Sequence, residues 1–97
     1  MKKIEYNIKV VKWDTRETKK DIIKGYLYKT ANNFYGIDRR YEHLWYVTEL
    51  RTGMKLLEIN RLKDVYVELT EELDYTVTQV LSKMSETKYV NDIELYK

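Results

Sequence analysis

The stretch HLWYVTELRTGMKLLEI, from His43 to Ile59, decides the fold class of this 97-residue chain. Residues 43–50 and 54–59 are rich in aromatic, aliphatic and β-branched side chains, which are typical of strands. The Arg-Thr-Gly between them matches a three-residue hairpin loop, which commonly ends on a residue with left-handed backbone geometry. Glycine adopts that geometry without a steric penalty, so Gly53 fits the last position of the loop. The stretch therefore predicts an antiparallel hairpin.

Three more strands are predicted before this hairpin. In residues 3–10 apolar and polar side chains alternate, which indicates a strand with one buried face. Residues 22–30 and 34–41 also suit strands, and Gly25 inside the first of them suggests a bulge or a close backbone approach. The segment at 14–21, DTRETKKD, has no apolar residue and is expected to be a charged connection.

The C-terminal half predicts one helix. Thr70 has the character of a helix N-cap, and Glu71 and Glu72 would follow it at the positive end of the helix dipole. An apolar stripe at helical spacing supports a helix of about four turns; it consists of Leu73, Val77, Val80, Leu81 and Met84. Before the cap, residues 64–69 alternate and predict a sixth strand. Residues 88–97 allow two arrangements, a last strand or a segment lying over the core.

Together these segments predict an α+β fold in a single domain, residues 1–97. Short consecutive strands favour hairpins, and hence an antiparallel sheet of five to six strands. A partly open barrel is the alternative arrangement of the same strands. The helix of the C-terminal half is expected to pack on the sheet.

Composition excludes several kinds of site. The chain has no cysteine, which removes disulfides, thiolate nucleophiles and cysteine-based metal centres. His43 is the only histidine, so a histidine-rich metal site is excluded as well. The three glycines stand far apart and form no phosphate-binding loop. We therefore expect a protein that is not an enzyme and that holds no cofactor and no metal.

The N-terminal residues MKKIEYNIKVVKW carry two lysines without an uninterrupted apolar stretch behind them, unlike a signal peptide. No apolar run elsewhere reaches the roughly 20 residues that a membrane span needs. The expectation is a cytoplasmic protein without a membrane partner.

Charge is distributed unevenly along the chain. Residues 1–63 carry 15 Lys and Arg against 8 Asp and Glu, a net charge of +7. Residues 64–97 carry 3 against 8, a net charge of −5, which leaves a total of +2. Glu71, Glu72 and Asp74 are candidates for binding a partner, because an acidic surface can imitate a nucleic-acid backbone. An ordinary solvated helix face is the alternative interpretation.

Ten tyrosines and two tryptophans supply a second candidate surface. In the strand at 43–50, Trp45 and Tyr46 fall on opposite faces, so both faces carry large apolar groups. Such a strand needs cover on both sides, from barrel closure, a homodimer or a different protein. Tyr, Trp and Arg are enriched at binding hot spots. A protein partner is therefore expected here, with further candidate contacts at Arg39, Arg40 and Tyr41.

The same residues also allow a nucleic-acid partner. Single-strand binders combine basic grooves with aromatic side chains on which bases stack. Aromatic and basic residues intermix between positions 24 and 46, although Tyr and Trp also serve simply as strand formers in a small core. The second hypothesis is thus a small nucleic-acid-binding β-rich protein. The third is a self-associating structural or assembly component.

The pattern WYVTELRTGMKLLEI ahead of a helix, the high Lys and Tyr content and the absence of Cys and Pro resemble small accessory proteins of phages and mobile elements from AT-rich bacteria. Many such proteins bind without catalysing a reaction, and some inhibit host defence nucleases. The resemblance implies a protein-binding accessory protein in the cytoplasm of a bacterial host. Its partner would be a host nuclease or a defence complex such as CRISPR-Cas. No functional residue is carried over.

Overall fold

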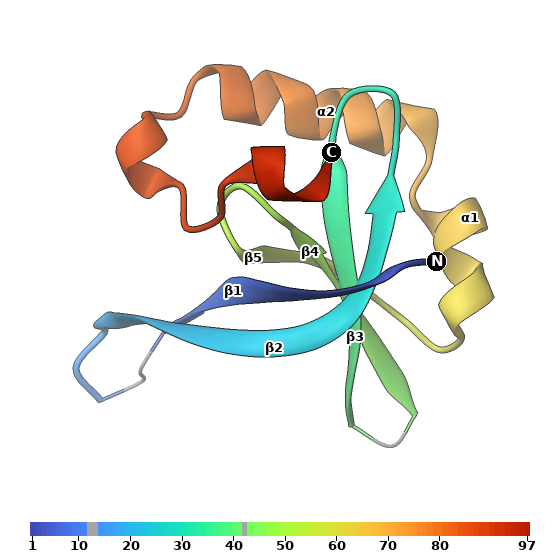
Figure 1. The fold of residues 1–97 in the computed structure, drawn as a ribbon, viewed down its shortest axis with the longest axis horizontal. Coiled ribbons are helices and arrows are strands. Elements are labelled where there is room, and N and C mark those ends of the chain that lie inside the picture. Colours follow the sequence, from blue (N-terminus) through green and yellow to red (C-terminus); the bar gives the residue numbers. More distant parts are fainter. Residues whose placement is uncertain (12–13, 42) are drawn as a thin grey trace.

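The computed structural model describes residues 1–11, 14–41 and 43–97, with only the backbone described for Val11 and Tyr41. Five strands form one sheet; they are β1 (Lys3–Val11), β2 (Thr18–Lys29), β3 (Phe34–Tyr41), β4 (Leu44–Glu49) and β5 (Met54–Ile59). They pair antiparallel in the order β1-β2-β3-β4-β5. Figure 1 shows the β1–β2 and β3–β4 hairpins projecting from the body as two arms. The predicted α+β fold with an antiparallel sheet is confirmed.

The β4–β5 hairpin forms as predicted. Gly53 has a φ of 70°, in the left-handed region. The carboxylate of Glu49 accepts hydrogen bonds of 2.8 Å from the amides of Arg51 and Thr52, which holds the turn closed. The carbonyl of Gly53 accepts a 2.9 Å hydrogen bond from the amide of Lys9. The turn therefore also fixes the position of β1.

The sheet curls until β1 reaches this turn, and its inner face encloses a small core. That core consists of Tyr6, Ile8, Leu27, Leu50 and Tyr96. The Tyr6 hydroxyl donates a 2.9 Å hydrogen bond to Asp38 on β3. A Cβ at Gly36 would overlap the Tyr6 ring, and one at Gly25 would lie 2.8 Å from the Tyr6 hydroxyl oxygen. The Gly25 Cβ would lie closer still to the carbonyl oxygen of Ile37, at 2.5 Å, so the close backbone approach expected at Gly25 is an approach to β3.

Two helices cover the outer face of the sheet, α1 (Val65–Glu68) and α2 (Glu71–Ser82). The chain also has 3-10 turns at Leu62–Asp64, Glu86–Lys88 and Ile93–Tyr96, the last of which lies at the inner core. The outer core consists of Tyr35, Ile37, Val47, Ile59, Val65, Leu69, Val77 and Leu81. Thr70 caps α2, since its Oγ1 accepts a 3.1 Å hydrogen bond from the amide of Leu73. The cap and the start of the helix are where the sequence predicts them, but α2 ends at Ser82, before Met84 of the predicted stripe, and Val80 of the stripe is 52% exposed.

The prediction of a strand at residues 64–69 is wrong, because α1 occupies this segment. Val65 and Leu69 are buried, whereas Val67 between them is 74% exposed. A four-residue spacing fits one face of a helix as well as one face of a strand. Packing Val65 and Leu69 into the outer core favours the helix.

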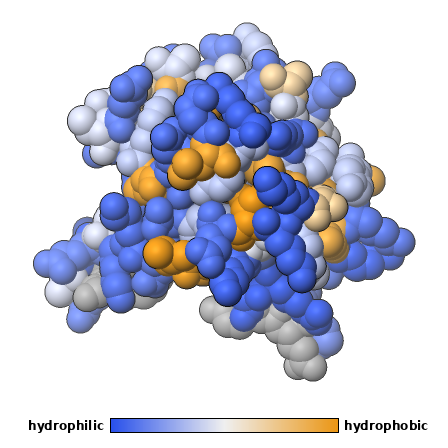
Figure 2. All heavy atoms as spheres, viewed as in Figure 1, coloured by the Kyte–Doolittle hydropathy of each residue, from blue (hydrophilic) through white to orange (hydrophobic). Residues whose placement is uncertain are grey.

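The charged connection predicted at residues 14–21 is shorter than expected, because β2 begins at Thr18. Thr18 pairs with Val11, and Lys20 pairs with Lys9, so the hairpin continues as a two-stranded arm. An arm that leaves the body exposes both faces, and charged side chains are stable there. Figure 2 shows mainly hydrophilic side chains on both arms in this view, with hydrophobic areas nearer the centre.

The chain after α2 packs Met84 and Tyr89 against the outer core and Tyr96 into the inner core, and it adds no strand to the sheet among the described residues. Its last 3-10 turn, Ile93–Tyr96, buries Tyr96 and leaves Leu95 75% exposed. Of the two arrangements open for residues 88–97, the structure has the one in which the segment covers the core.

Candidate interaction surface

Four aromatic side chains form a row of two contacting pairs on the outer face of the sheet, beside α1. The rings of Trp45 and Tyr26 have centroids 6.1 Å apart, and those of Tyr28 and Tyr66 are 5.6 Å apart in an edge-to-face arrangement. Tyr26 and Tyr28 are two positions apart on β2, so they point to the same face. Tyr66, on α1, is 63% exposed, and the other three are partly buried. We call these four residues the aromatic row.

One end of the row is basic. The guanidinium of Arg39 lies over the Trp45 ring, with its central carbon 5.9 Å from the ring centroid. Lys3 is the cross-strand partner of Tyr26, and Lys24 precedes Tyr26 by two positions on the same face. Lys3, Lys24 and Arg39 make up the basic end. Lys24 pairs with Glu5 at 3.8 Å, but both side chains stay largely exposed, so this pair contributes little.

The other end of the row is acidic. Tyr28 lines a cavity of about 600 Å³ between the β2–β3 turn and the start of α2. Tyr75, Glu71 and Glu72 line the same cavity. The two glutamates are exposed and form no ion pair with the described residues. Trp45, Arg39, Glu71 and Glu72, which the sequence singles out as separate candidates, therefore lie along one surface, joined by tyrosines.

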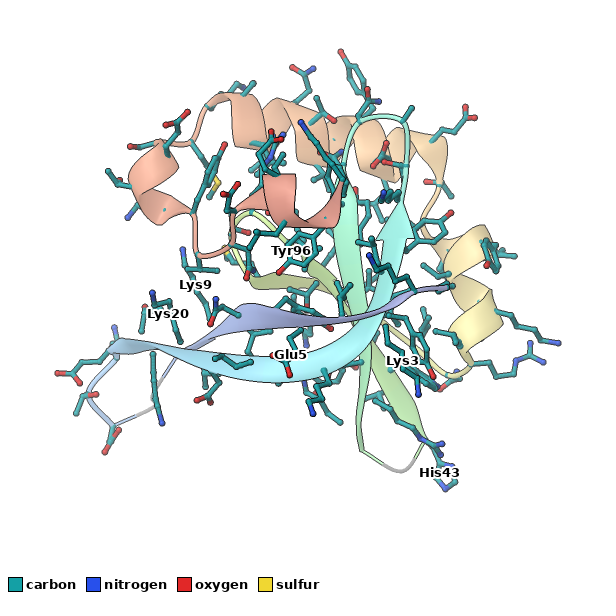
Figure 3. All side chains as sticks on the ribbon, in the orientation of Figure 1. Lys3, Glu5, Lys9, Lys20, His43 and Tyr96 are labelled. Carbon is teal, nitrogen blue, oxygen red and sulfur yellow. The ribbon has the colours of Figure 1, made fainter. Side chains whose placement is uncertain are left out.

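Tyr46 and Arg40 lie on the inner face of the β3–β4 hairpin, opposite the face that carries Trp45 and Arg39. The Arg40 Nε donates a 2.7 Å hydrogen bond to the buried carboxylate of Asp38, and the Arg40 guanidinium carbon lies 4.5 Å from the Tyr46 ring centroid. Lys55 covers the same ring at 4.9 Å. These contacts tie Arg40 and Tyr46 into the domain and separate them from the aromatic row. Figure 3 shows His43 at the tip of this arm, pointing away from the body.

Asp74 is an interior residue, with 6% of its surface exposed. Its Oδ1 accepts hydrogen bonds from Tyr35 at 2.6 Å, Thr30 at 2.8 Å and Asn33 at 2.9 Å. Burial alone would raise the pKa of Asp74, but the hydrogen bonds to its carboxylate outweigh it, so the pKa lies below its ordinary value. Asp74 joins α2 to β3 and the β2–β3 turn, and although it lines the cavity beside Tyr28, its carboxylate is engaged inside the domain.

The side chain of Tyr41, another candidate, lies outside the described part of the structure. Three contributors to the surface lie outside the residues that the sequence singles out: Lys3, Tyr66 and Tyr75, of which the two tyrosines are more than 60% exposed. Tyr66 is missed because the sequence pattern of residues 64–69 predicts a strand. In the observed helix Tyr66 lies about 100° around the axis from Val65, at the side of the buried Val65–Leu69 stripe, where its ring meets Tyr28.

Within residues 1–11, 14–41 and 43–97, no group of three or more His, Cys, Asp or Glu is arranged to hold a metal ion. No helix in these ranges is long and apolar enough to cross a membrane. Comparison with protein-family models, with curated proteins and with solved structures finds no match for this chain.

Proposed function

We propose that this chain is a non-enzymatic accessory protein that binds a protein partner through the aromatic row. The observation that carries the proposal is the position of the row, two contacting aromatic pairs on one face, between a basic and an acidic end. Tyr, Trp and Arg dominate binding hot spots, because they combine large apolar area with polar tips. Opposite charges at the two ends would set the orientation of the partner.

The finer part of the proposal concerns the partner. The resemblance to phage and mobile-element proteins favours a host nuclease or a defence complex such as CRISPR-Cas. A nuclease presents a basic channel to its substrate, and exposed carboxylates such as those of Glu71 and Glu72 can occupy such a channel. The partner would then cover Tyr28 and Tyr66 beside these glutamates.

The test compares two aromatic residues of one strand. Trp45→Ala removes a member of the row, whereas Tyr46→Ala removes a ring of similar size from the opposite face. For a purified partner, we expect Trp45→Ala and Tyr66→Ala each to raise the Kd about tenfold or more, equivalent to ~1.4 kcal/mol, in titration calorimetry. Tyr46→Ala should leave the Kd nearly unchanged. Equal effects of Trp45→Ala and Tyr46→Ala would contradict the proposal.

A nucleic-acid partner is the second candidate, favoured by the three cations of the basic end beside Tyr26 and Trp45. A binder of this kind loses affinity steeply as salt rises, because bound cations are released from the phosphates. Fluorescence anisotropy with labelled single-stranded DNA and RNA at low and high salt tests it. Affinity that falls with salt and with Lys24→Glu would support this candidate, and no binding at low salt would remove it.

A further inference from the structure

The two edge strands of the sheet, β1 and β5, differ in whether other segments of the chain bond to their free edges. The outer edge of β1 is bonded to the C-terminal segment and to the β4–β5 turn. Asn91 exchanges two hydrogen bonds of 2.8 Å with the backbone of Asn7, and the Tyr96 hydroxyl donates a 2.9 Å bond to the carbonyl of Glu5. Such cover is one way in which proteins prevent an edge strand from pairing with another chain.

The outer edge of β5 has no such cover among the described residues, since β5 pairs only with β4. An apolar groove with a cavity of about 210 Å³ runs beside this edge, between β5 and α2. Met54 and Leu56 line its strand side, and Leu73, Val80 and Met84 line its helix side. Met54 is 50% exposed and Val80 is 52% exposed. The open edge and the exposed apolar side chains therefore lie together.

A bulge in the β4–β5 pair determines which side chains of β5 pack against the outer core and which stay exposed. The register of the β4–β5 pair shifts between Val47 and Thr48, so that Leu56 and Leu57 both pack against the outer core. Lys55 and Glu58 remain exposed and form an ion pair of 2.6 Å. The strand thus carries its positive charge near its beginning and its negative charge near its end.

We propose that the β5 edge and its groove bind a second copy of this chain, in a two-fold antiparallel arrangement of the two β5 strands. A two-fold axis brings the beginning of one strand to the end of the other, so Lys55 of each copy faces Glu58 of the other. This charge complementarity is what selects a second copy as the partner. The same arrangement buries Met54 and Val80 and gives the edge backbone groups hydrogen-bond partners.

This interface is separate from the aromatic row, so either proposal can fail without the other. Lys55→Glu gives a copy with two negative charges on the strand, and Glu58→Lys gives a copy with two positive charges. In sedimentation equilibrium, each single variant should dimerise with a Kd about tenfold or more above that of the wild type, because like charges then face each other. An equimolar mixture of the two variants should recover association as a mixed dimer.

A matched control exists in Glu94 and Lys97, an exposed ion pair of 2.8 Å with the same three-residue spacing. Glu94→Lys and Lys97→Glu should leave the association unchanged. A wild type that stays monomeric at millimolar concentration overturns the proposal. So does a dimer that tolerates both β5 charge changes, or a mixture of the variants that associates no better than either alone.

A second pair of variants tests the groove. Val80→Glu places a charge on an exposed position of α2 at the groove, and Val67→Glu places one on α1, outside the groove lining. Circular dichroism should show both variants folded, because both side chains are more than half exposed. Val80→Glu should raise the dimer Kd about tenfold or more, and Val67→Glu should not. Equal effects of the two substitutions overturn the placement of the interface.

Discussion

The Tyr35 hydroxyl donates a 2.6 Å hydrogen bond to Oδ1 of Asp74, which joins the start of β3 to the first turn of α2. Tyr35 is fully buried and Asp74 nearly so. Burial and the adjacent carboxylate raise the pKa of the Tyr35 hydroxyl far above its ordinary value. The pair therefore stays a neutral phenol donating to an ionised carboxylate over a wide range of pH.

Replacing Asp74 with Asn should destabilise the fold. All three donors bond to Oδ1, and the neutral oxygen of an amide accepts these bonds more weakly than a charged carboxylate oxygen. The amide also places a donor where the second carboxylate oxygen stood. We expect Asp74→Asn to lower the free energy of unfolding by about 1–3 kcal/mol in chemical denaturation. Glu71→Gln, on the same turn but exposed, is the control and should change it by less than about 0.5 kcal/mol. Equal losses would mean that the bonds to Asp74 contribute no net stability.

Lowering the pH should remove the stability that the ionised Asp74 contributes to the fold. Hydrogen bonding holds the pKa of folded Asp74 below the unfolded value of about 3.9. Stability from the ionised group is therefore present above the unfolded pKa and is lost as pH falls through the folded pKa. The difference in unfolding free energy between wild type and Asp74→Asn should narrow between about pH 6 and pH 2. A difference that stays constant over this range would assign the effect of the substitution to shape alone.

Local sequence signals were enough for the parts of the fold that local geometry determines. Gly53 follows from the turn that two flanking strands require, and Thr70 from the unpaired amides at a helix start. The prediction of a strand at residues 64–69 is wrong because the spacing of Val65 and Leu69 fits both a period of two and a helical period. Only the contact of these two residues with the outer core distinguishes the helix from the strand. The start of β2 was not predicted correctly, because its first residues pair in an exposed arm, where a strand needs no alternation of apolar and polar residues.

The candidate surface depends more on tertiary contacts than the fold does. Alternation correctly separates Trp45 from Tyr46, but it does not show which side is covered by helices. Asp74 was chosen with Glu71 and Glu72 because the three are close in sequence. Helical geometry turns Asp74 toward the start of β3 and the turn before it, where Tyr35 and Asn33 donate hydrogen bonds to its carboxylate. The unpaired glutamates and Tyr28 meet only because α2 starts beside the end of β2.

Adding a single methyl group at Gly36 should disrupt the inner core. A Cβ there would overlap the Tyr6 ring, which the surrounding core prevents from moving. We expect Gly36→Ala to lower the melting temperature, with a loss of about 1–3 kcal/mol in unfolding free energy. In a Tyr6→Leu background the same change should cost less, because the ring is absent. Additive losses in this double-mutant cycle would show that the strain lies elsewhere.

Removing the Asn91 side chain should open the covered edge of the sheet. Asn91→Ala deletes the acceptor of the Asn7 amide and the donors to the carbonyls of Asn7 and Leu50. The loss of unfolding free energy should be about 1–3 kcal/mol, since buried backbone groups lose their partners. Hydrogen exchange at the Asn7 amide should accelerate, and the exposed Asn60 mutated to Ala is the control.

The same variant connects the two edges. With the β5 edge joined to a second copy, opening the β1 edge gives each dimer two further free edges, and such contacts do not close on themselves. Light scattering of Asn91→Ala should therefore show species larger than a dimer that grow with concentration. Adding Val80→Glu should reduce these species to small assemblies. Unchanged exchange at Asn7, together with a strictly dimeric Asn91→Ala, would mean that the C-terminal segment is not what keeps this edge from pairing.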